Sequence, residues 1–242
     1  MNSIRAESAS RREFLGKTGI LLTSAAMIFP DIHLAQAKSK EKEKEQEGEK
    51  VSPPEDLMRE HGVLRRILLI YEDIQGRVNN GKEFPPEVLS SAAGIIQRFI
   101  EQYHEKLEED YLFQRFEKAC KLVELVNVLK EQHKAGRHLT EFIKTSAVPG
   151  TLKDEPKRKE LAEKLHLFIR MYRPHASRED TILFPAFRSI VSASEFDDLG
   201  EEFEDKEVAL FGEGGFEKVV GEVANLEKPL DIYELAQFTP PK

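Results

Sequence analysis

The chain has 242 residues, of which 40% are hydrophobic and 33% are charged, enough for one domain of ordinary size with long solvated helices. Acidic residues outnumber basic ones 44 to 36, so the formal net charge is −8, which argues against a general nucleic-acid-binding protein. The single cysteine, Cys120, excludes an internal disulfide and a thiolate metal site, and no apolar run reaches the ~18 residues of a membrane-spanning helix. Any metal site must therefore use histidine and carboxylate ligands.

The first 37 residues predict an export signal. The string SRREFL at residues 10–15 resembles the twin-arginine pattern, a weakly polar apolar segment follows at residues 18–30, and Ala35-Gln36-Ala37 supplies a small-x-small cleavage site. The competing interpretation is a short amphipathic helix with a chance arginine pair, and the occurrence of three features in this order favours the signal. We therefore expect residues 1–37 to be a signal peptide and the mature protein to be periplasmic or otherwise exported, a route typical of proteins that fold around a cofactor first.

A charged linker is predicted at residues 38–52, because Lys38 to Lys50 is almost entirely lysine and glutamate and offers no apolar side chain to bury. From Pro53 onward, apolar residues recur at intervals of three and four, which is typical of α-helices. This change of pattern marks the start of the folded body.

Three breaks divide the body, two at Pro/Gly/Asn clusters and a weaker one near residues 118–121. Pro174 and Pro185 should kink the last helix or loosen its backbone hydrogen bonding. The expected fold is all-α, an antiparallel up-down-up-down four-helix bundle at residues 53–192, followed by a short helical C-terminal extension and tail at 193–242. The four predicted helices span roughly residues 54–78, 86–117, 121–146 and 156–192.

The second and fourth predicted helices share the pattern H-x3-E-acidic-x2-L-F-x2-F, which begins at His104 and again at His175. The first and third each hold a histidine at a matching offset, since His61 precedes His104 by 43 residues and His133 precedes His175 by 42. In an antiparallel helix pair, residues equidistant from the turn lie at one level, and the midpoint of each pair falls in a predicted turn. All four histidines are therefore expected in one transverse plane.

The glutamate of each H-x3-E pattern, Glu108 or Glu179, lies about 40° round the helix from its histidine and one turn along. Neutral imidazoles can cap two cations from outside while two carboxylates bridge them, and this ligand mixture suits iron, manganese or zinc. The competing interpretation treats the histidines as ordinary helix residues and the pairs as surface contacts. Two copies at one level with two further histidines favour a two-metal site.

These motifs resemble the helix signatures of the hemerythrin-like family, the HHE cation-binding four-helix bundles with a non-haem di-iron centre. The matching segments are residues 60–66, His104-x3-Glu108 with Leu112-Phe113, residues 132–137, and His175-x3-Glu179 with residues 183–185. The resemblance implies a di-iron cofactor, with manganese or zinc less favoured. It implies terminal ligands and bridging ligands as follows: His61, His104, His133 and His175 as terminal ligands, and Glu108 and Glu179 as bridges.

One position departs from the family's oxygen carriers, which have a fifth histidine one turn after the third-helix histidine. Here that position is Arg137, and His138 lies one residue later, about 140° round the helix from His133. The departure argues against reversible oxygen carriage. Water, His138 or a nearby acid such as Glu105 are the candidates for the vacant ligand position.

Three further side chains fall near the predicted plane. Tyr111 lies about 20° from the face of His104, where it either hydrogen-bonds a ligand or, as we favour, packs in the core. Glu109 and Asp180 follow the bridges by one residue, about 100° round the helix, and should face outward or support the ligands from behind. Asp180 is also the alternative bridge to Glu179, because the oxygen carriers take their second bridge from that position.

Two functions are compatible with such a site. The first is the binding or reduction of dioxygen, peroxide or nitric oxide at iron, which requires an open coordination position. The second is iron storage, buffering or sensing without turnover. A purely structural bundle is the third alternative. The expected partner is a small diatomic or peroxide ligand, with no nucleic acid and no membrane span, and the redox partner is left open.

Overall fold

The computed structural model describes residues 51–240, and within this range the chain is helical and forms no strand. The predicted signal peptide and residues 38–50 of the predicted linker lie outside the described residues. None of the described helices combines the length and the apolar character that crossing a membrane requires.

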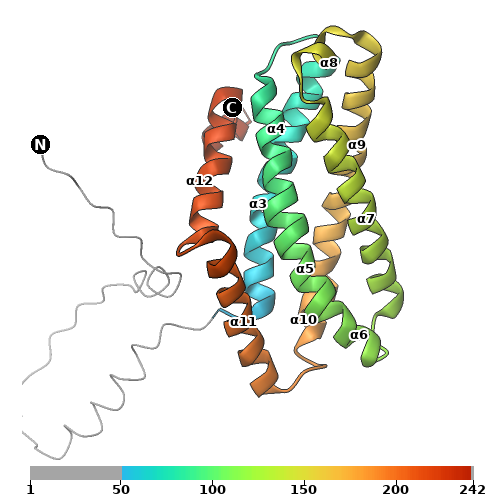
Figure 1. Cartoon of the computed structure of the whole chain (residues 1–242), viewed down its shortest axis with the longest axis vertical. Helices are drawn as coiled ribbons and strands as arrows, with labels where there is room; N and C mark the ends of the chain where they lie inside the picture. Colours follow the sequence, from blue (N-terminus) through green and yellow to red (C-terminus); the bar gives the residue numbers. More distant parts are fainter. Residues whose placement is uncertain (1–50, 241–242) are drawn as a thin grey trace, which may run out of the picture.

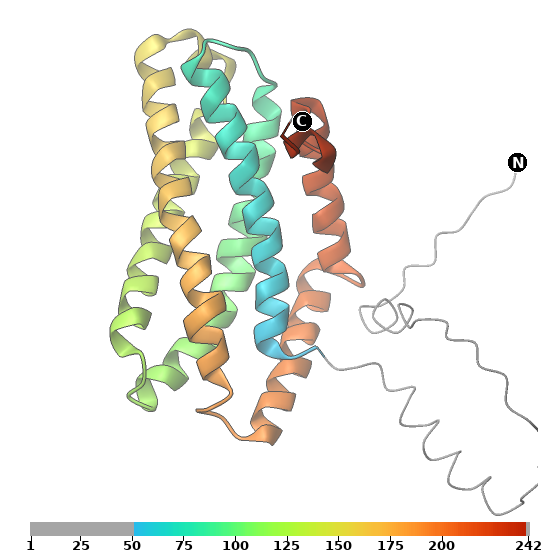
Figure 2. The same ribbon diagram turned by 180° about the vertical axis from the view of Figure 1, so that it is seen from behind.

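Four long helical segments run up and down in a bundle (Figures 1 and 2), which confirms the predicted all-α architecture. The first segment is α3 (Pro53–Asn79) and the third is α7 (Val123–Ser146). The second consists of α4 (Pro86–Ile95), η2 (Ile96–His104), α5 (Glu105–Leu107), η3 (Glu108–Phe113) and α6 (Gln114–Lys118). The fourth consists of α9 (Glu155–Arg178), η4 (Glu179–Leu183) and α10 (Phe184–Phe187), and the short α8 (Pro149–Lys153) precedes it.

Local sequence signals explain where these helices begin and end. A capping box opens α3, because the Glu55 carboxylate accepts from the Ser52 backbone N–H at 3.1 Å. The fourth segment ends at Phe187 and not at residue 192 as predicted, because residues 188–192 turn the chain and the Ser192 hydroxyl accepts from Glu195 N at 3.2 Å to cap the next helix.

Three segments of π-helix interrupt the second and fourth helices, and each carries a predicted ligand: η2 ends at His104, η3 begins at Glu108 and η4 begins at Glu179. Wider π turns inside α-helices are frequently found at functional sites. Pro185 accounts in part for η4, because a proline lacks the N–H that would continue the α-helical pattern. Pro174, in contrast, lies inside α9, which continues through it to Arg178.

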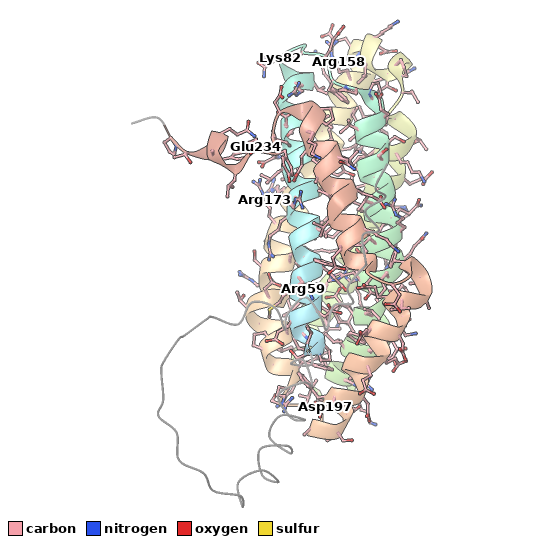
Figure 3. The ribbon with its side chains drawn as sticks, turned by 90° about the vertical axis from the view of Figure 1, so that its left-hand side faces the viewer. Arg59, Lys82, Arg158, Arg173, Asp197 and Glu234 are labelled. Carbon is pink, nitrogen blue, oxygen red and sulfur yellow. The ribbon has the colours of Figure 1, made fainter. Side chains whose placement is uncertain are left out.

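The C-terminal extension comprises α11 (Ala193–Phe211), α12 (Gly215–Glu227), η5 (Lys228–Leu230) and η6 (Leu235–Phe238). Figures 1 and 2 show α11 and α12 lying along the bundle beside α3 and α4. In Figure 3, Glu234 lies on a short segment that projects away from the bundle. The extension therefore adds a further layer to one face of the four helices.

Helices α7 and α9 approach closely at Gly136, where the ring of Tyr172 occupies the space of a side chain. A Cβ at Gly136 would lie 1.9 Å from the Tyr172 hydroxyl oxygen and 2.7 Å from Cζ. Since Tyr172 is buried, we expect Gly136→Ala to lower the free energy of unfolding by about 1–3 kcal/mol in urea titrations. Gly76→Ala is the control, because no side chain and no other helix lies within 4 Å of its Cβ position and alanine should stabilise the helix by about 0.5–1 kcal/mol. Equal stability of the two variants would contradict this packing.

Candidate metal centre

The structure brings the six predicted ligands together in the interior of the bundle. The histidines come from four different segments, α3, η2, α7 and α9, and the two glutamates open η3 and η4. Every one of the six side chains is at most 3% exposed: His61, His104, Glu108, His133, His175 and Glu179. The matching distances of the histidines from the predicted turns predict this convergence. The packing of the four helices buries the six side chains in the core.

Each glutamate contacts one histidine from each half of the cluster. Glu108 Oε2 lies 3.7 Å from His104 Nε2 and 3.4 Å from His133 Nε2. Glu179 Oε2 lies 3.3 Å from the Nε2 of His61 and 3.1 Å from the Nε2 of His175. The two carboxylates therefore stand between the histidine pairs, which is the placement that bridging two cations requires.

The histidines themselves form two pairs. The Nε2 atoms of His61 and His104 are 3.1 Å apart, and the ring centroids of His133 and His175 are 5.1 Å apart. Donor atoms of Glu108, His133, His175 and Glu179 all lie within 4.8 Å of one another, and the same holds for His61, His104 and Glu108. Two adjoining clusters able to hold a metal thus share Glu108.

Several buried polar atoms in the cluster lack hydrogen-bond partners and could instead bind a metal ion. Among the described residues, no hydrogen bond of acceptable geometry reaches either carboxylate oxygen of Glu108 or of Glu179, or His133 Nε2. Buried carboxylates without hydrogen bonds are costly, and a coordinated cation satisfies both their charge and their lone pairs. The donor set of imidazole nitrogen and carboxylate oxygen suits iron, and also manganese or zinc.

Each histidine is oriented from outside, because its Nδ1–H donates to an oxygen and its Nε2 faces the centre. These partners are Asp180 for His61 (2.6 Å), Glu60 for His104 (2.8 Å), Glu109 for His133 (3.1 Å) and Gln132 for His175 (2.9 Å). Outer acceptors of this kind set the tautomer and the ring orientation of metal-binding histidines. Glu109 and Asp180 thus lie behind the histidines, at the positions from which a supporting role was predicted.

Sequence reasoning missed the other two partners, Glu60 and Gln132, although a signal is present. Each precedes a ligand histidine, as Glu60-His61 and Gln132-His133, and each hydrogen-bonds the other histidine of its pair. A glutamate or glutamine before the histidine thus recurs at the repeat spacing, and this pattern would have marked both residues as part of the site.

The phenylalanines of the repeated L-F dipeptide pack on ligand rings. Phe184 stacks on His61 with ring centroids 5.5 Å apart, and Phe113 stacks on His133 at the same distance. Both phenylalanines are at most 1% exposed. These rings wall the cluster on the side toward α6 and α10 and help to exclude water from it.

Two of the predicted supporting residues lie away from the cluster. The Tyr111 hydroxyl donates to Glu202 on α11 at 2.5 Å, and the Tyr111 ring packs edge-on against Phe203. Its ring therefore packs against the core, as the favoured interpretation expected, and the alternative, a hydrogen bond to a ligand, is wrong. The wider turn of η3 between His104 and Tyr111 alters the α-helical register on which that prediction rested. His138 is exposed on α7, and it therefore does not fill the position of the carriers' fifth histidine.

A network of charged and polar groups occupies the neighbourhood of that position. Arg137 donates to Glu105 Oε2 at 2.8 Å and to Glu109 Oε1 at 2.6 Å. The buried Tyr172 hydroxyl, which sequence reasoning missed, donates to Glu105 Oε1 at 2.7 Å. Tyr172 precedes His175 by three residues, so it lies on the same helix face. The predicted candidate Glu105 is therefore present beside His133, with both of its oxygens engaged by protein donors.

The carboxylates of the cluster raise the pKa of two of its histidines, His61 and His133. Burial by itself would lower the pKa of His61, but the bonds to Asp180 and Glu179 outweigh it and raise that pKa to about 9. Burial opposes charge on His133 as well, yet the surrounding carboxylates, Glu105 first, raise its pKa to about 10. At neutral pH and in the absence of metal, both imidazoles are therefore protonated on both nitrogens and positively charged.

The pKa values of His104, Glu108 and Glu179 are shifted as well. Burial lowers the pKa of His104 to about 4, so this imidazole is neutral and able to act as a ligand. Burial and the nearby charge of Glu179 raise the pKa of Glu108. Burial would raise the pKa of Glu179 too, but His175 and His61 hold it well below its usual range.

Metal uptake should release protons, because metal-binding imidazoles must be neutral. At pH 7, below the pKa values of about 9 and 10, His61 and His133 are charged in the metal-free protein and each must lose its proton. We expect a release of protons on metal binding in a weakly buffered titration with a pH indicator, to which His61 and His133 contribute one each. The apparent affinity should therefore rise between pH 6 and pH 9, and an affinity independent of pH would contradict this charge distribution.

The fold and the site together define a class of protein: four-helix bundles with buried clusters of histidine and glutamate able to hold metal cations. The family model described as the hemerythrin HHE cation binding domain matches residues 52–187, which is more than half of the chain. The protein therefore belongs to the hemerythrin HHE cation-binding family, as the sequence motifs indicated. The extension formed by α11 and α12 lies beyond the matched residues.

Similar proteins occur in mycobacteria. Uncharacterized proteins of Mycobacterium bovis and Mycobacterium tuberculosis are 50% identical to this chain over 190 residues, covering 78% of this chain and 74% of theirs. No solved structure matches the chain at a significant level.

Proposed function

We propose that the protein holds a non-haem di-iron centre and binds or reduces a small molecule there, namely dioxygen, peroxide or nitric oxide. The ligands are the four histidines and two glutamates of the cluster: His61, His104, His133, His175, Glu108 and Glu179. The observation that carries this proposal is the pair of buried glutamates, each in contact with both histidine pairs and neither satisfied by a hydrogen bond.

The chain's own residues prepare the site in three ways. Outer oxygens hold the histidines with Nε2 directed inward, and Phe113 and Phe184 exclude water from one side. Arg137 holds Glu105 and Glu109 in place of a fifth imidazole, so six protein ligands remain. Bound iron would supply an open coordination position and electrons for the small molecule.

Metal analysis of protein purified after expression without added metals tests the centre itself. We expect about two iron atoms per chain, since two carboxylates and four imidazoles suit a pair of cations. Protein that folds and holds no metal would contradict the proposal and favour a purely structural bundle. Manganese or zinc in the same ratio would retain the centre and overturn the assignment to iron.

Anaerobic stopped-flow spectroscopy tests the reaction. The reduced iron protein is mixed separately with dioxygen, peroxide and nitric oxide, and a di-iron centre open to small molecules should change its visible spectrum with at least one of them. Iron that is held at full occupancy but reacts with none of the three would overturn small-molecule chemistry and favour storage, buffering or sensing.

We further propose that the protein is exported by the twin-arginine route, a proposal supported by the order of sequence features in residues 1–37. Replacing Arg11 and Arg12 together by lysine should leave the protein, with its metal, in the cytoplasm. Arg5→Lys, outside the motif, is the matched control and should be exported normally. Cell fractionation with immunoblotting measures both, and undiminished export of the double variant would contradict the route.

A further inference from the structure

The extension places a buried acid beside the support of one ligand. Asp56 and Glu60 on α3 and Glu207 on α11 have carboxylate oxygens within 4.8 Å of one another, and their exposed fractions are 5%, 0% and 2%. Glu60 is the residue whose carboxylate accepts from His104 Nδ1 at 2.8 Å. Glu207 therefore lies next to the group that orients a proposed iron ligand.

The turn between α11 and α12 is built around Glu207. Its Oε1 accepts from the backbone N–H of Phe216 at 3.0 Å. A Cβ at Gly215 would lie 3.2 Å from Glu207 Oε1 and 2.6 Å from Phe211 Cβ, so a glycine leaves the room that the carboxylate needs. The position of Glu207 is thereby tied to the backbone of both extension helices.

Aromatic packing anchors this turn to the ligand-bearing helix. Phe211 packs against Phe99 and Tyr103 with ring centroids 5.5 and 5.4 Å apart, and Tyr103 directly precedes His104. Arg59 on α3 lies 4.6 Å above the ring of Phe216. The extension and the ligand-bearing part of the bundle are therefore packed as one unit around the acids.

We propose that Glu207 is a positioning residue of the metal centre, acting through Glu60 on His104. The inference rests on the di-metal centre of the proposed function. Glu207 confines Glu60 to the place where it accepts from His104, and such outer contacts determine how firmly a histidine holds its metal. The extension is thus part of the centre as well as a cover for the bundle.

The test compares Glu207→Leu, Glu207→Gln and the matched control Glu227→Leu. Glu227 is also a buried acid of the extension bonded to α3, through Arg66 Nε at 2.8 Å, and it is distant in sequence from any ligand support. The measurement is the rate at which a ferrous chelator removes iron from the reduced full-length protein, well below the melting temperature of every variant. Mössbauer spectra of the same samples report the two iron sites separately.

We expect Glu207→Leu to speed the loss of iron about threefold or more, a smaller effect than the ~10–100-fold typical of groups that contact a ligand directly. The Mössbauer signal of one iron should change while that of the other stays. Glu207→Gln keeps the shape and an oxygen acceptor for Phe216 N–H, so it should release iron at least about threefold more slowly than Glu207→Leu. Glu227→Leu should lower the melting temperature and leave the release rate and the spectrum unchanged.

Release from Glu207→Leu at the wild-type rate would overturn the inference, and so would equal acceleration in Glu227→Leu, which would indicate a general loosening of the extension. A wild-type protein without iron would contradict the proposed centre itself. If the wild type holds two irons and all three variants release iron at the same rate, the role of Glu207 is contradicted but the proposed centre is not.

Discussion

Replacing either of the proposed bridging glutamates, Glu108 or Glu179, by alanine should lower the metal content from about two ions per chain toward one or none. Glu108 and Glu179 each contact imidazoles of both histidine pairs, so each is expected to share its negative charge between two cations. Its loss leaves the repulsion between the cations less screened. Metal analysis of Glu108→Ala and Glu179→Ala, purified as the wild type is, measures the effect.

The controls are the acids that follow the proposed bridges. Among the atoms of the proposed ligands, Glu109 and Asp180 bond the outward Nδ1 atoms of His133 and His61, so their alanine variants should keep nearly full metal and lose only about tenfold in affinity. Loss of metal in Asp180→Ala combined with full metal in Glu179→Ala would show that Asp180 is the second bridge. Its bonds to His61 Nδ1 and to Arg65, together with partial exposure, favour the outer role.

Removing the metal should lower the melting temperature by several degrees or more. Six ionisable ligands lie at most 3% exposed in one layer of the core, and without cations the carboxylate oxygens there lack hydrogen bonds. A metal that binds the folded state and has no preformed site in the unfolded chain stabilises the fold by linkage. Calorimetry before and after chelation, with metal content measured in the same samples, gives the shift.

A bridge variant provides the control for this experiment. Glu108→Ala should already lack much of its metal, so the chelator should change its melting temperature far less than that of the wild type. An unchanged melting curve in wild-type protein shown to be free of metal would contradict a buried site whose ligands depend on cations.

The sequence by itself determined which six side chains lie at one level of the bundle. Helix periodicity and the spacing of the repeat can both be read directly from residue positions. A repeat of H-x3-E on the second and fourth helices, with His61 and His133 at matching distances from the turns, leads to six side chains at one level. The four helices follow from the same apolar spacing, since a strip of apolar residues on each can be buried only against the others.

Only the tertiary structure decided what surrounds those ligands. The alternative of a ligand contact for Tyr111 assumed α-helical register through residues that form π turns, whereas its hydroxyl bonds Glu202 on the extension. Glu60 and Gln132 reach histidines on neighbouring helices, and Glu207 reaches Glu60 from about 150 residues further along the chain. Helix periodicity states which face a residue occupies but not which residue of another helix it meets. That choice depends on side-chain packing between helices, which acts across the whole chain.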